Sequence, residues 1–354
     1  MKAYPQIDAL LDQTENAQRC AHSSDPLIQK GLYRRYRAGD LARPYPGLFA
    51  RAEYWNQLNE PEQSLHAART LSRLHPNWVF AGITAAAAHG FDHPRFLHRQ
   101  GLTITLPNHG SYRPHDKLNI IYSPYPRENA VLANGIHVTN PPRTLLDCGR
   151  TLEFIYSLPI FDDAAADGIE EKQILQECAR TTLDCSRIFK LLRYTDAGSE
   201  NGGESFARAV MIENGFAVPQ LQVSFADSLT GKQFRVDFLW RTPDGRIIVG
   251  ELDGTAKYVD PKMTDRRSIQ ETVQAERERE QALFRAGVTE IVRLTFDDAV
   301  QQKPLIAKTA ACWGSLRFIG IIICGKIPPV SGGIGTLRSS PPGRFLQRVE
   351  KSRL

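Results

Sequence analysis

The hydrophobic and polar positions in the last third of the chain follow two periods. Residues 203–215 carry apolar side chains at the spacing of a helix, whereas short apolar or alternating stretches bounded by turn residues predict strands. A segment rich in acids and arginines predicts a second helix. The predicted order is helix, three strands, helix and strand, at 203–215, 218–225, 233–240, 246–253, about 267–286 and 290–296. We expect one sheet to bury together Val236, Phe238, Ile248, Leu283, Ile291 and Leu294.

The preceding part of the chain, 61–195, predicts a separate α/β domain. Strands are expected at 102–107 and 118–123, and a strand or turn leads into an alanine-rich helix at 78–91. Residues 135–150 predict a strand, a turn and a helix that starts at the prolines. This order of expected elements thus differs from the helix, three strands, helix and strand predicted for the last third of the chain.

Helices are expected through about 153–193, with interruptions at Pro159 and at Asp167-Gly168. Three histidines of the same region, His89, His93 and His98, are candidate ligands. Nothing else in the sequence completes a site around them, so we interpret them as satisfied or exposed side chains. We assign no chemistry to this domain.

Residues 1–60 predict a winged-helix-like DNA-binding domain. A helix is expected to end near Ala38 and Gly39, where glycine suits a C-terminal cap, and 41–51 predict a hairpin. A helix followed by a hairpin is typical of the end of a winged helix-turn-helix. A basic helix and wing fit phosphate contact, but the same run of charges also fits a solvated helix face. The candidate DNA-binding residues are Lys30, Arg34, Arg35, Arg37 and Arg43.

Glycines and polar residues at 195–203 mark the clearest domain boundary. The last segment, 312–354, is basic and contains a glycine- and proline-rich stretch, so we expect a disordered tail. The chain therefore divides into 1–60, 61–195, 203–298 and this tail.

The overall composition is that of an ordinary soluble protein, with 42% hydrophobic and 23% charged residues. The net charge of +5 is modest, so the placement of basic residues matters more than their total. Six cysteines without paired spacing indicate reduced thiols rather than disulfides or a zinc site. No apolar signal segment is visible at the start, and the longest apolar stretch is too short to span a bilayer. We expect a cytoplasmic protein that does not use a membrane.

The predicted strand at 246–253 ends in two carboxylates. Glu251 and Asp253 share one face of the strand, because side chains alternate along it. Like charges on one face repel, so something must compensate them. Asp237 on the neighbouring strand also needs a compensating group. It interrupts an apolar run, and burying it without a partner would be costly.

A divalent metal is one form of compensation. Asp237 and Glu251 would supply the oxygen ligands that Mg²⁺ prefers, and Glu204 on the preceding helix can pack alongside. Lys257 would then stabilise phosphate charge or orient water. No organic cofactor is indicated.

Ion pairing is the alternative. Asp237 would then pair with Arg235 or Arg293, and Glu251 would only end a strand. In either case a histidine base is excluded from the last domain, because all nine histidines lie in the first 137 residues.

The ordered stretches RVDFLW, VGELDGTAKY, AERERE and EIVRL resemble the PD-(D/E)XK nuclease fold, and more narrowly the domain relatives of very-short-patch mismatch-repair endonucleases. The resemblance covers about 203–298 and implies a restriction-endonuclease-like αβββαβ domain. The E-x-K lysine is missing, and Asp253 stands in its place. The resemblance implies the motif acids Asp237 and Glu251, the further site residues Glu204, Gln222 (with Gln220 as alternative) and Lys257, and the supporting pair Glu276 and Arg279.

The stretches YRRYRAGDLARPYPGLFA and GIHVTNPPRTLLDCGR resemble AbiEi-type antitoxin proteins, in which a winged helix precedes an α/β domain. This resemblance covers the chain to about residue 190. It implies binding to DNA, at the protein's own promoter or in phage defence, and a cognate toxin as a candidate partner.

The expected fold class is α+β multidomain, with an N-terminal winged helix-turn-helix, a middle α/β domain and a C-terminal restriction-endonuclease-like domain. The leading hypothesis is a DNA-associated protein with a metal-dependent endonuclease-like domain, acting in phage defence, a toxin–antitoxin system or DNA repair. One alternative is a non-enzymatic DNA-binding regulator or antitoxin whose nuclease-like domain is degenerate. Another is an RNA-directed nuclease or binder.

Overall fold

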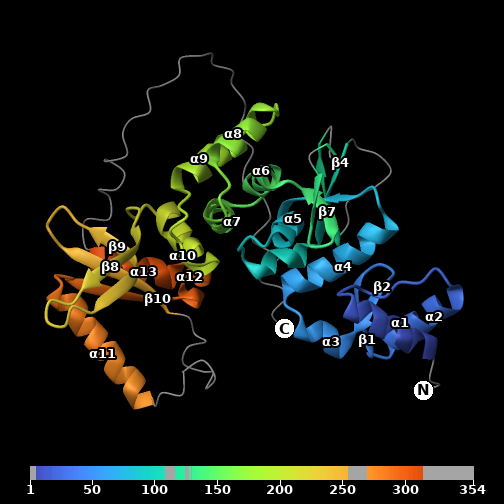
Figure 1. Cartoon of the computed structure of the whole chain (residues 1–354), viewed down its shortest axis with the longest axis horizontal. Helices are drawn as coiled ribbons and strands as arrows, with labels where there is room; N and C mark the ends of the chain where they lie inside the picture. The colour runs from blue at the N-terminus through green and yellow to red at the C-terminus, as the bar shows by residue number, and fades with distance from the viewer. Residues whose placement is uncertain (1–4, 108–115, 124–126, 129, 254–268, 314–354) are drawn as a thin grey trace.

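A computed structural model describes residues 5–107, 116–123, 127–128, 130–253 and 269–313. These residues form a mixed α and β structure with three sheets. Figure 1 shows the two-stranded sheet and the four-stranded sheet at opposite ends of the longest axis, with the five-stranded sheet and a group of helices between them. Within the described ranges, no helix is long and apolar enough to cross a membrane.

The N-terminal unit contains two helices, a hairpin and a short third helix: α1 (Pro5–Asn16), α2 (Pro26–Arg37), β1 (Leu41–Tyr45), β2 (Leu48–Arg51) and α3 (Ala52–Gln57). Asp25 caps α2 by accepting hydrogen bonds from two backbone amides, and Gly39, with a φ of 82°, follows its end. Gly31 lets α1 approach α2, because a Cβ there would lie 2.4 Å from Ile7 Cδ1. The expected helix end and hairpin are confirmed.

The five-stranded sheet has the order β5-β4-β3-β7-β6, with β3 parallel to β7 and β4 parallel to β5. The predicted strands are present, whereas β6, which pairs with β7 as a hairpin, was not predicted. Helices α4 and α5 and the short 3₁₀ helix η1 belong to the same unit. Its elements are α4 (Glu60–Leu74), β3 (Val79–Phe80), α5 (Gly82–His89), η1 (Arg95–Gln100), β4 (Leu102–Leu106), β5 (Leu118–Tyr122), β6 (Ala130–Ala133) and β7 (Ile136–Thr139).

Four helices follow: α6 (Pro141–Thr151), α7 (Phe154–Ala166), α8 (Glu171–Ala179) and α9 (Ser186–Tyr194). The predicted interruption at Asp167-Gly168 is confirmed, because α7 ends at Ala166 and α8 begins at Glu171. The predicted interruption at Pro159 is wrong, because α7 continues through it. A proline inside a helix costs about 3 kcal/mol. Its neighbours Leu158, Ile160 and Phe161 are at most 1% exposed, and burial of each such side chain contributes about 1.5–3 kcal/mol. Core packing therefore outweighs the backbone penalty.

The C-terminal unit has the predicted order of helix, three strands, helix and strand, followed by two helices that were not predicted. Its four-stranded sheet has the order β11-β10-β9-β8; β10 and β11 are parallel, and the other pairs are antiparallel. The elements are α10 (Gly202–Glu213), β8 (Gln220–Ala226), β9 (Gln233–Arg241), β10 (Ile247–Asp253), α11 (Ile269–Arg285), β11 (Glu290–Thr295), α12 (Phe296–Gln301) and α13 (Lys303–Trp313).

The core residues predicted for this sheet are divided between two clusters. Val236 and Leu283 pack in the cluster on the α11 side, with Ile291 partly buried against them. Phe238, Ile248 and Leu294 belong to the cluster that contains the apolar side chains of α10. Burial is thus confirmed for five of the six, but the expectation of one group is corrected to two, one on each face of the sheet.

The core on the α10 side continues across the predicted boundary at 195–203. It also contains the apolar side chains of α6 to α9, so this segment does not separate two cores. A buried ion pair crosses the same junction: Arg208 of α10 and Asp162 of α7 are joined at 2.6 Å, and their side chains are 1% and 2% exposed. Arg208 also donates to the carbonyl of Tyr194, and Asp162 accepts from the amide of Asp196. The pair fixes α10 against the middle helices.

We predict that Arg208→Met lowers the free energy of unfolding by about 3–5 kcal/mol, because Asp162 is left buried without its partner. Burial already raises the pKa of Asp162, and loss of the guanidinium raises it further. The penalty belongs to the ionised form, so the loss grows as the pH rises through that pKa. Urea unfolding at mildly acidic and mildly basic pH measures both effects.

The matched control is Lys190→Met, which removes a partner from the exposed pair with Glu213 and should change stability by about 1 kcal/mol or less. Equal losses for the two variants would contradict the role given to the buried pair.

Candidate functional site

Three of the predicted site residues form one hydrogen-bonded chain. Gln222 of β8 donates from Nε2 to Glu204 Oε2 of α10 at 2.9 Å and lies 3.5 Å from Asp237 Oδ1 of β9. The second oxygen of Asp237 accepts from the backbone amide of Leu252 at 2.9 Å. Glu204 is 4% exposed and also accepts from the side chain of Asn201. The structure therefore joins α10, β8, β9 and the end of β10 through Gln222 and Asp237.

The backbone at Gln222 is what places this side chain. Its φ of 52° lies in the left-handed region, which few residues other than glycine adopt. Side chains two apart on a strand normally share a face, yet Leu221 packs with the core on the α10 side and Val223 with the core on the α11 side. The paired strand β9 changes faces at Asp237 in the same way. Gln222 and Asp237 therefore lie where the apolar side chains of β8 and β9 change from the core on one face of the sheet to the core on the other.

Glu251 lies on β10, the strand next to β9, and has different partners from those of Asp237. Its Oε1 accepts from Arg279 of α11 at 2.5 Å and 3.1 Å, and its Oε2 lies 3.7 Å from Arg293 of β11. Parallel pairing of β10 with β11 puts Glu251 beside Arg293 in register. Burial raises the pKa of Glu251, although both guanidiniums oppose that rise. Arginine is thus the compensation that the structure provides for this carboxylate.

Arg293 also contacts the carboxylates of Glu276, Glu280 and Asp253. It donates to Glu276 and, at 2.9 Å, to Glu280, both on α11, and it lies 3.5 Å from Asp253. Burial lowers the pKa of Arg293, but the hydrogen bonds and charges of these acids outweigh it and raise the pKa above its ordinary value. The predicted supporting residues of α11 therefore contact different partners, Glu276 with Arg293 and Arg279 with Glu251.

Neither form of the ion-pairing alternative describes Asp237, because Arg235 pairs with Glu200 and Arg293 with the acids of the α11 side. The carboxylate of Asp237 is instead held by amide groups. Lys257 lies outside the described residues. Gln220 is exposed, so of the two candidate glutamines Gln222 is the one joined to the acids.

Arg279 lies 2.5 Å from Oε1 of Glu251 and Arg293 lies 3.7 Å from Oε2, so a Mg²⁺ ion shared with Asp237 would compete with two guanidiniums for these oxygens. In the part of the chain that the structure describes, no group of three or more His, Cys, Asp or Glu side chains comes together as a metal-ligand set. The magnesium site stays a prediction.

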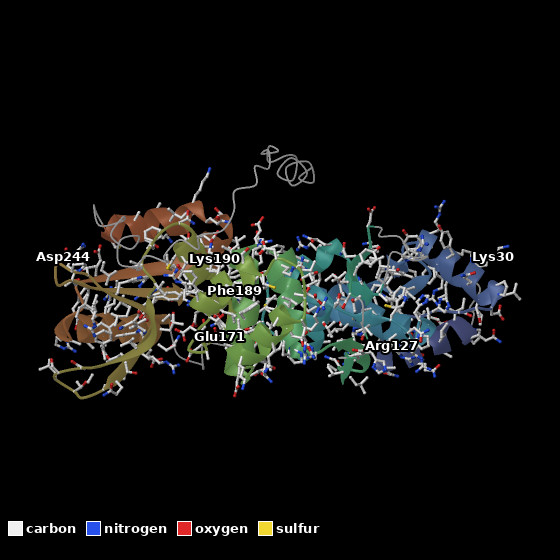
Figure 2. The ribbon with its side chains drawn as sticks, turned by 90° about the horizontal axis from the view of Figure 1, so that it is seen from above. Lys30, Arg127, Glu171, Phe189, Lys190 and Asp244 are labelled. Carbon is white, nitrogen blue, oxygen red and sulfur yellow. The ribbon has the colours of Figure 1, made fainter. Side chains whose placement is uncertain are left out.

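The predicted DNA-binding residues lie at the other end of the molecule. Figure 2 shows Lys30 at one end and Asp244, in the turn between β9 and β10, at the opposite end. Four of the five candidates are exposed: Lys30, Arg34, Arg37 and Arg43. Arg35 differs, because its side chain is 16% exposed and bridges Asp8 of α1 and Asp40, each at 2.5 Å. It holds the unit together internally.

Arg293 and Glu280 are the residues of this cluster that sequence reasoning missed as site members. Arg293 was considered only as a partner of Asp237. The available signal was the predicted helix between two strands, since a strand–helix–strand connection makes the two strands parallel neighbours and brings Arg293 beside Glu251.

Comparison with known proteins adds no relative. No family model, no curated protein and no solved structure matches the chain.

Proposed function

We propose that the protein binds DNA through the exposed face of α2 and its hairpin, and that the C-terminal unit is a nuclease-like scaffold in which arginines take the place of a metal. The observation that carries the proposal is the charge of this face. Lys30, Arg34 and Arg37 are spaced by three or four residues and therefore lie along one side of the helix. Arg43 of β1 adds a fourth cation next to it, 5.4 Å from the ring of Tyr33.

Four acids of the N-terminal unit pair with arginines outside this set of cations. Arg35 pairs with Asp8 and Asp40, and Arg51 pairs with Asp12 and Glu15 of α1. Asp8, Asp12 and Glu15 of α1, together with Asp40, are thus held by Arg35 and Arg51. Leu27 is 81% exposed at the start of the same helix, and an apolar side chain there suits contact with a thymine methyl group.

At the opposite end, the described residues include a cluster with a surplus of carboxylates. The described cluster of β10, β11 and α11 brings together two guanidiniums and four carboxylates: Glu251, Asp253, Glu276 and Glu280 with Arg279 and Arg293. A net negative cluster repels a phosphodiester unless a cation intervenes. With Arg279 and Arg293 in the place of that cation, the cluster fits a non-enzymatic regulator or antitoxin, the class implied by the resemblance of the N-terminal part.

A metal-dependent nuclease is the second candidate, and the same surplus of carboxylates favours it. A divalent cation would offset that surplus, and Asp237 lies on the neighbouring strand with Glu204 joined to it through Gln222. Cleavage would then require Arg279 to leave Glu251.

We predict that replacing Lys30, Arg34 and Arg37 together by alanine flattens the slope of log K against log salt for duplex DNA by about 2.7, since each lost phosphate contact removes about 0.9 from it. Fluorescence anisotropy over a series of salt concentrations measures the slope. Lys172→Ala, an exposed lysine of α8, is the control and should leave it unchanged. Arg35→Ala should lower thermal stability instead. A triple variant with the parent's slope would refute the assignment of this face.

We also predict no cleavage when supercoiled or linear DNA is incubated with the protein and Mg²⁺, Mn²⁺ or EDTA. Divalent-dependent nicking that Asp237→Asn abolishes, while the melting temperature and DNA affinity stay the same, would establish the second candidate instead. Asp244→Asn, in the turn between β9 and β10, removes the same charge away from the site and is the matched control.

A further inference from the structure

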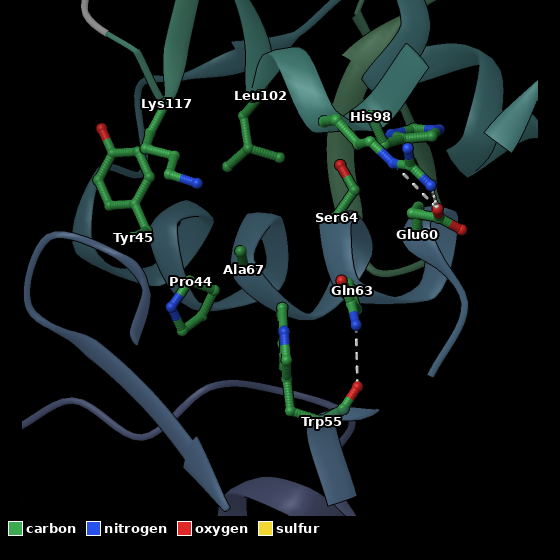
Figure 3. A pocket seen from close by; sticks show the side chains of 12 residues that line it. Pro44, Tyr45, Trp55, Glu60, Gln63, Ser64, Ala67, His98, Leu102 and Lys117 are labelled. Atoms are coloured by element: carbon green, nitrogen blue, oxygen red, sulfur yellow. Dashed lines mark hydrogen bonds and ion pairs between the residues drawn. The ribbon is translucent and has the colours of Figure 1, made fainter. Parts of the chain in front are cut away.

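A cavity of about 260 Å³ lies where the N-terminal unit meets the five-stranded sheet. Its lining comes from β1, α3, α4, η1, β4 and the residue before β5. Figure 3 shows the side chains of these elements arranged around one space, with Trp55 and Tyr45 among them. Gly101 is required beside it, because its φ is 93° and a Cβ would lie 2.5 Å from the backbone of Lys117. The glycine thus lets Lys117 reach the cavity rim.

The protonation of His98 at this cavity follows from its neighbours. His93 Nδ1 lies 2.5 Å from the carbonyl oxygen of Phe91, which can only accept, so His93 carries its proton there. Burial lowers the pKa of both histidines, that of His98 to about 3, so both are neutral at neutral pH. His93 Nε2 is then an acceptor, and His98 Nε2, at 2.7 Å, donates to it. His98 Nδ1 is therefore an unprotonated acceptor.

Two buried polar atoms of the lining have no hydrogen-bond partner among the residues that the structure describes. They are His98 Nδ1 and Ser64 Oγ, each on a side chain that is 8% exposed. A buried acceptor left without a donor costs about 1–3 kcal/mol. A molecule in the cavity that donates to His98 Nδ1 recovers this energy, and Ser64 can accept or donate beside it.

The charged side chains and the aromatic walls of the cavity indicate which class of molecule it would bind. Glu60 is paired with Arg99 at 2.8 Å, and Lys117 adds a further positive charge to the lining. Figure 3 shows the ammonium of Lys117 turned toward the space above Ala67. Trp55 and Tyr45 supply flat aromatic surfaces. An anionic group suits Lys117, and a ring suits the aromatic walls.

We propose that this cavity binds a small aromatic carboxylate that carries a hydroxyl group, with the carboxylate at Lys117 and the hydroxyl donating to His98 Nδ1. The site goes beyond the proposed function. Its regulatory consequence rests on that function: Tyr45 and Pro44 of the lining belong to β1, directly after Arg43 of the DNA-binding face. A ligand that fixes β1 therefore changes the position of Arg43 and the affinity for DNA.

The test is calorimetric titration of the full chain, without DNA, with 3-hydroxybenzoate, 4-hydroxybenzoate, benzoate and 4-hydroxybenzamide. At least one hydroxybenzoate should bind about tenfold more tightly than benzoate, which lacks the donor, and than the uncharged amide. Lys117→Met should remove the advantage over the amide, and Ser64→Ala should weaken binding with the fold retained. Lys172→Met, on the surface of α8, is the control.

Absence of binding by both hydroxybenzoates, or equal binding of all four compounds, would overturn the site. So would a Lys117→Met variant that still prefers the carboxylate to the amide while keeping the parent's melting temperature. Anisotropy with duplex DNA, with and without the tightest probe, tests the link separately. Ligand binding without any DNA binding would refute the proposed function and leave the site standing, whereas DNA binding that the bound probe leaves unchanged would refute only the link.

Discussion

The buried ion pair between Arg208 and Asp162 is the contact on which the arrangement of the C-terminal site depends. It holds α10 against α7, and α10 carries Glu204 to the edge of the four-stranded sheet. A buried pair of this kind contributes little net stability compared with an apolar contact, but breaking it is costly, so it fixes one relative position of the two elements. The middle helices therefore act as the support of the site, which explains why the core runs without interruption across the glycine-rich segment at 195–203.

Two neighbouring acids of the same sheet are compensated in different ways. Asp237 lies where β9 passes from one core to the other, and amide groups reach it there. Glu251 faces α11, and among the described residues Arg279 of that helix and Arg293 of β11 contact it. Guanidinium groups hold a carboxylate with directed hydrogen bonds and need no exchangeable ion. In the structure the charge of Glu251 is opposed by two guanidiniums, and the cluster around it keeps a surplus of carboxylates. The positive face of α2 lies at the other end of the molecule.

Much of the C-terminal unit could be predicted from the sequence, because its order of elements follows from local periodicity and turn residues. The place of Gln222 beside Glu204 and Asp237 followed from resemblance. The partner of Arg279 could not be predicted, since it depends on which side of α11 packs against β10. The helix through Pro159 depends on burial that only the assembled core supplies. The pairing of His93 with His98 was missed for a similar reason. His98 lies in a 3₁₀ helix and His93 just before it, and a spacing of five residues there does not indicate that the two rings meet.

The central proposal is that Arg279 and Arg293, and not a divalent ion, hold the carboxylate of Glu251. Titration of the full chain with Mn²⁺, followed by the electron paramagnetic resonance signal of the free ion, tests it most directly. The account predicts that the wild type and Asp237→Asn bind Mn²⁺ alike, and that Arg279→Met, which frees Glu251, binds more. One equivalent of Mn²⁺ bound by the wild type and lost in both Asp237→Asn and Glu251→Gln would contradict it.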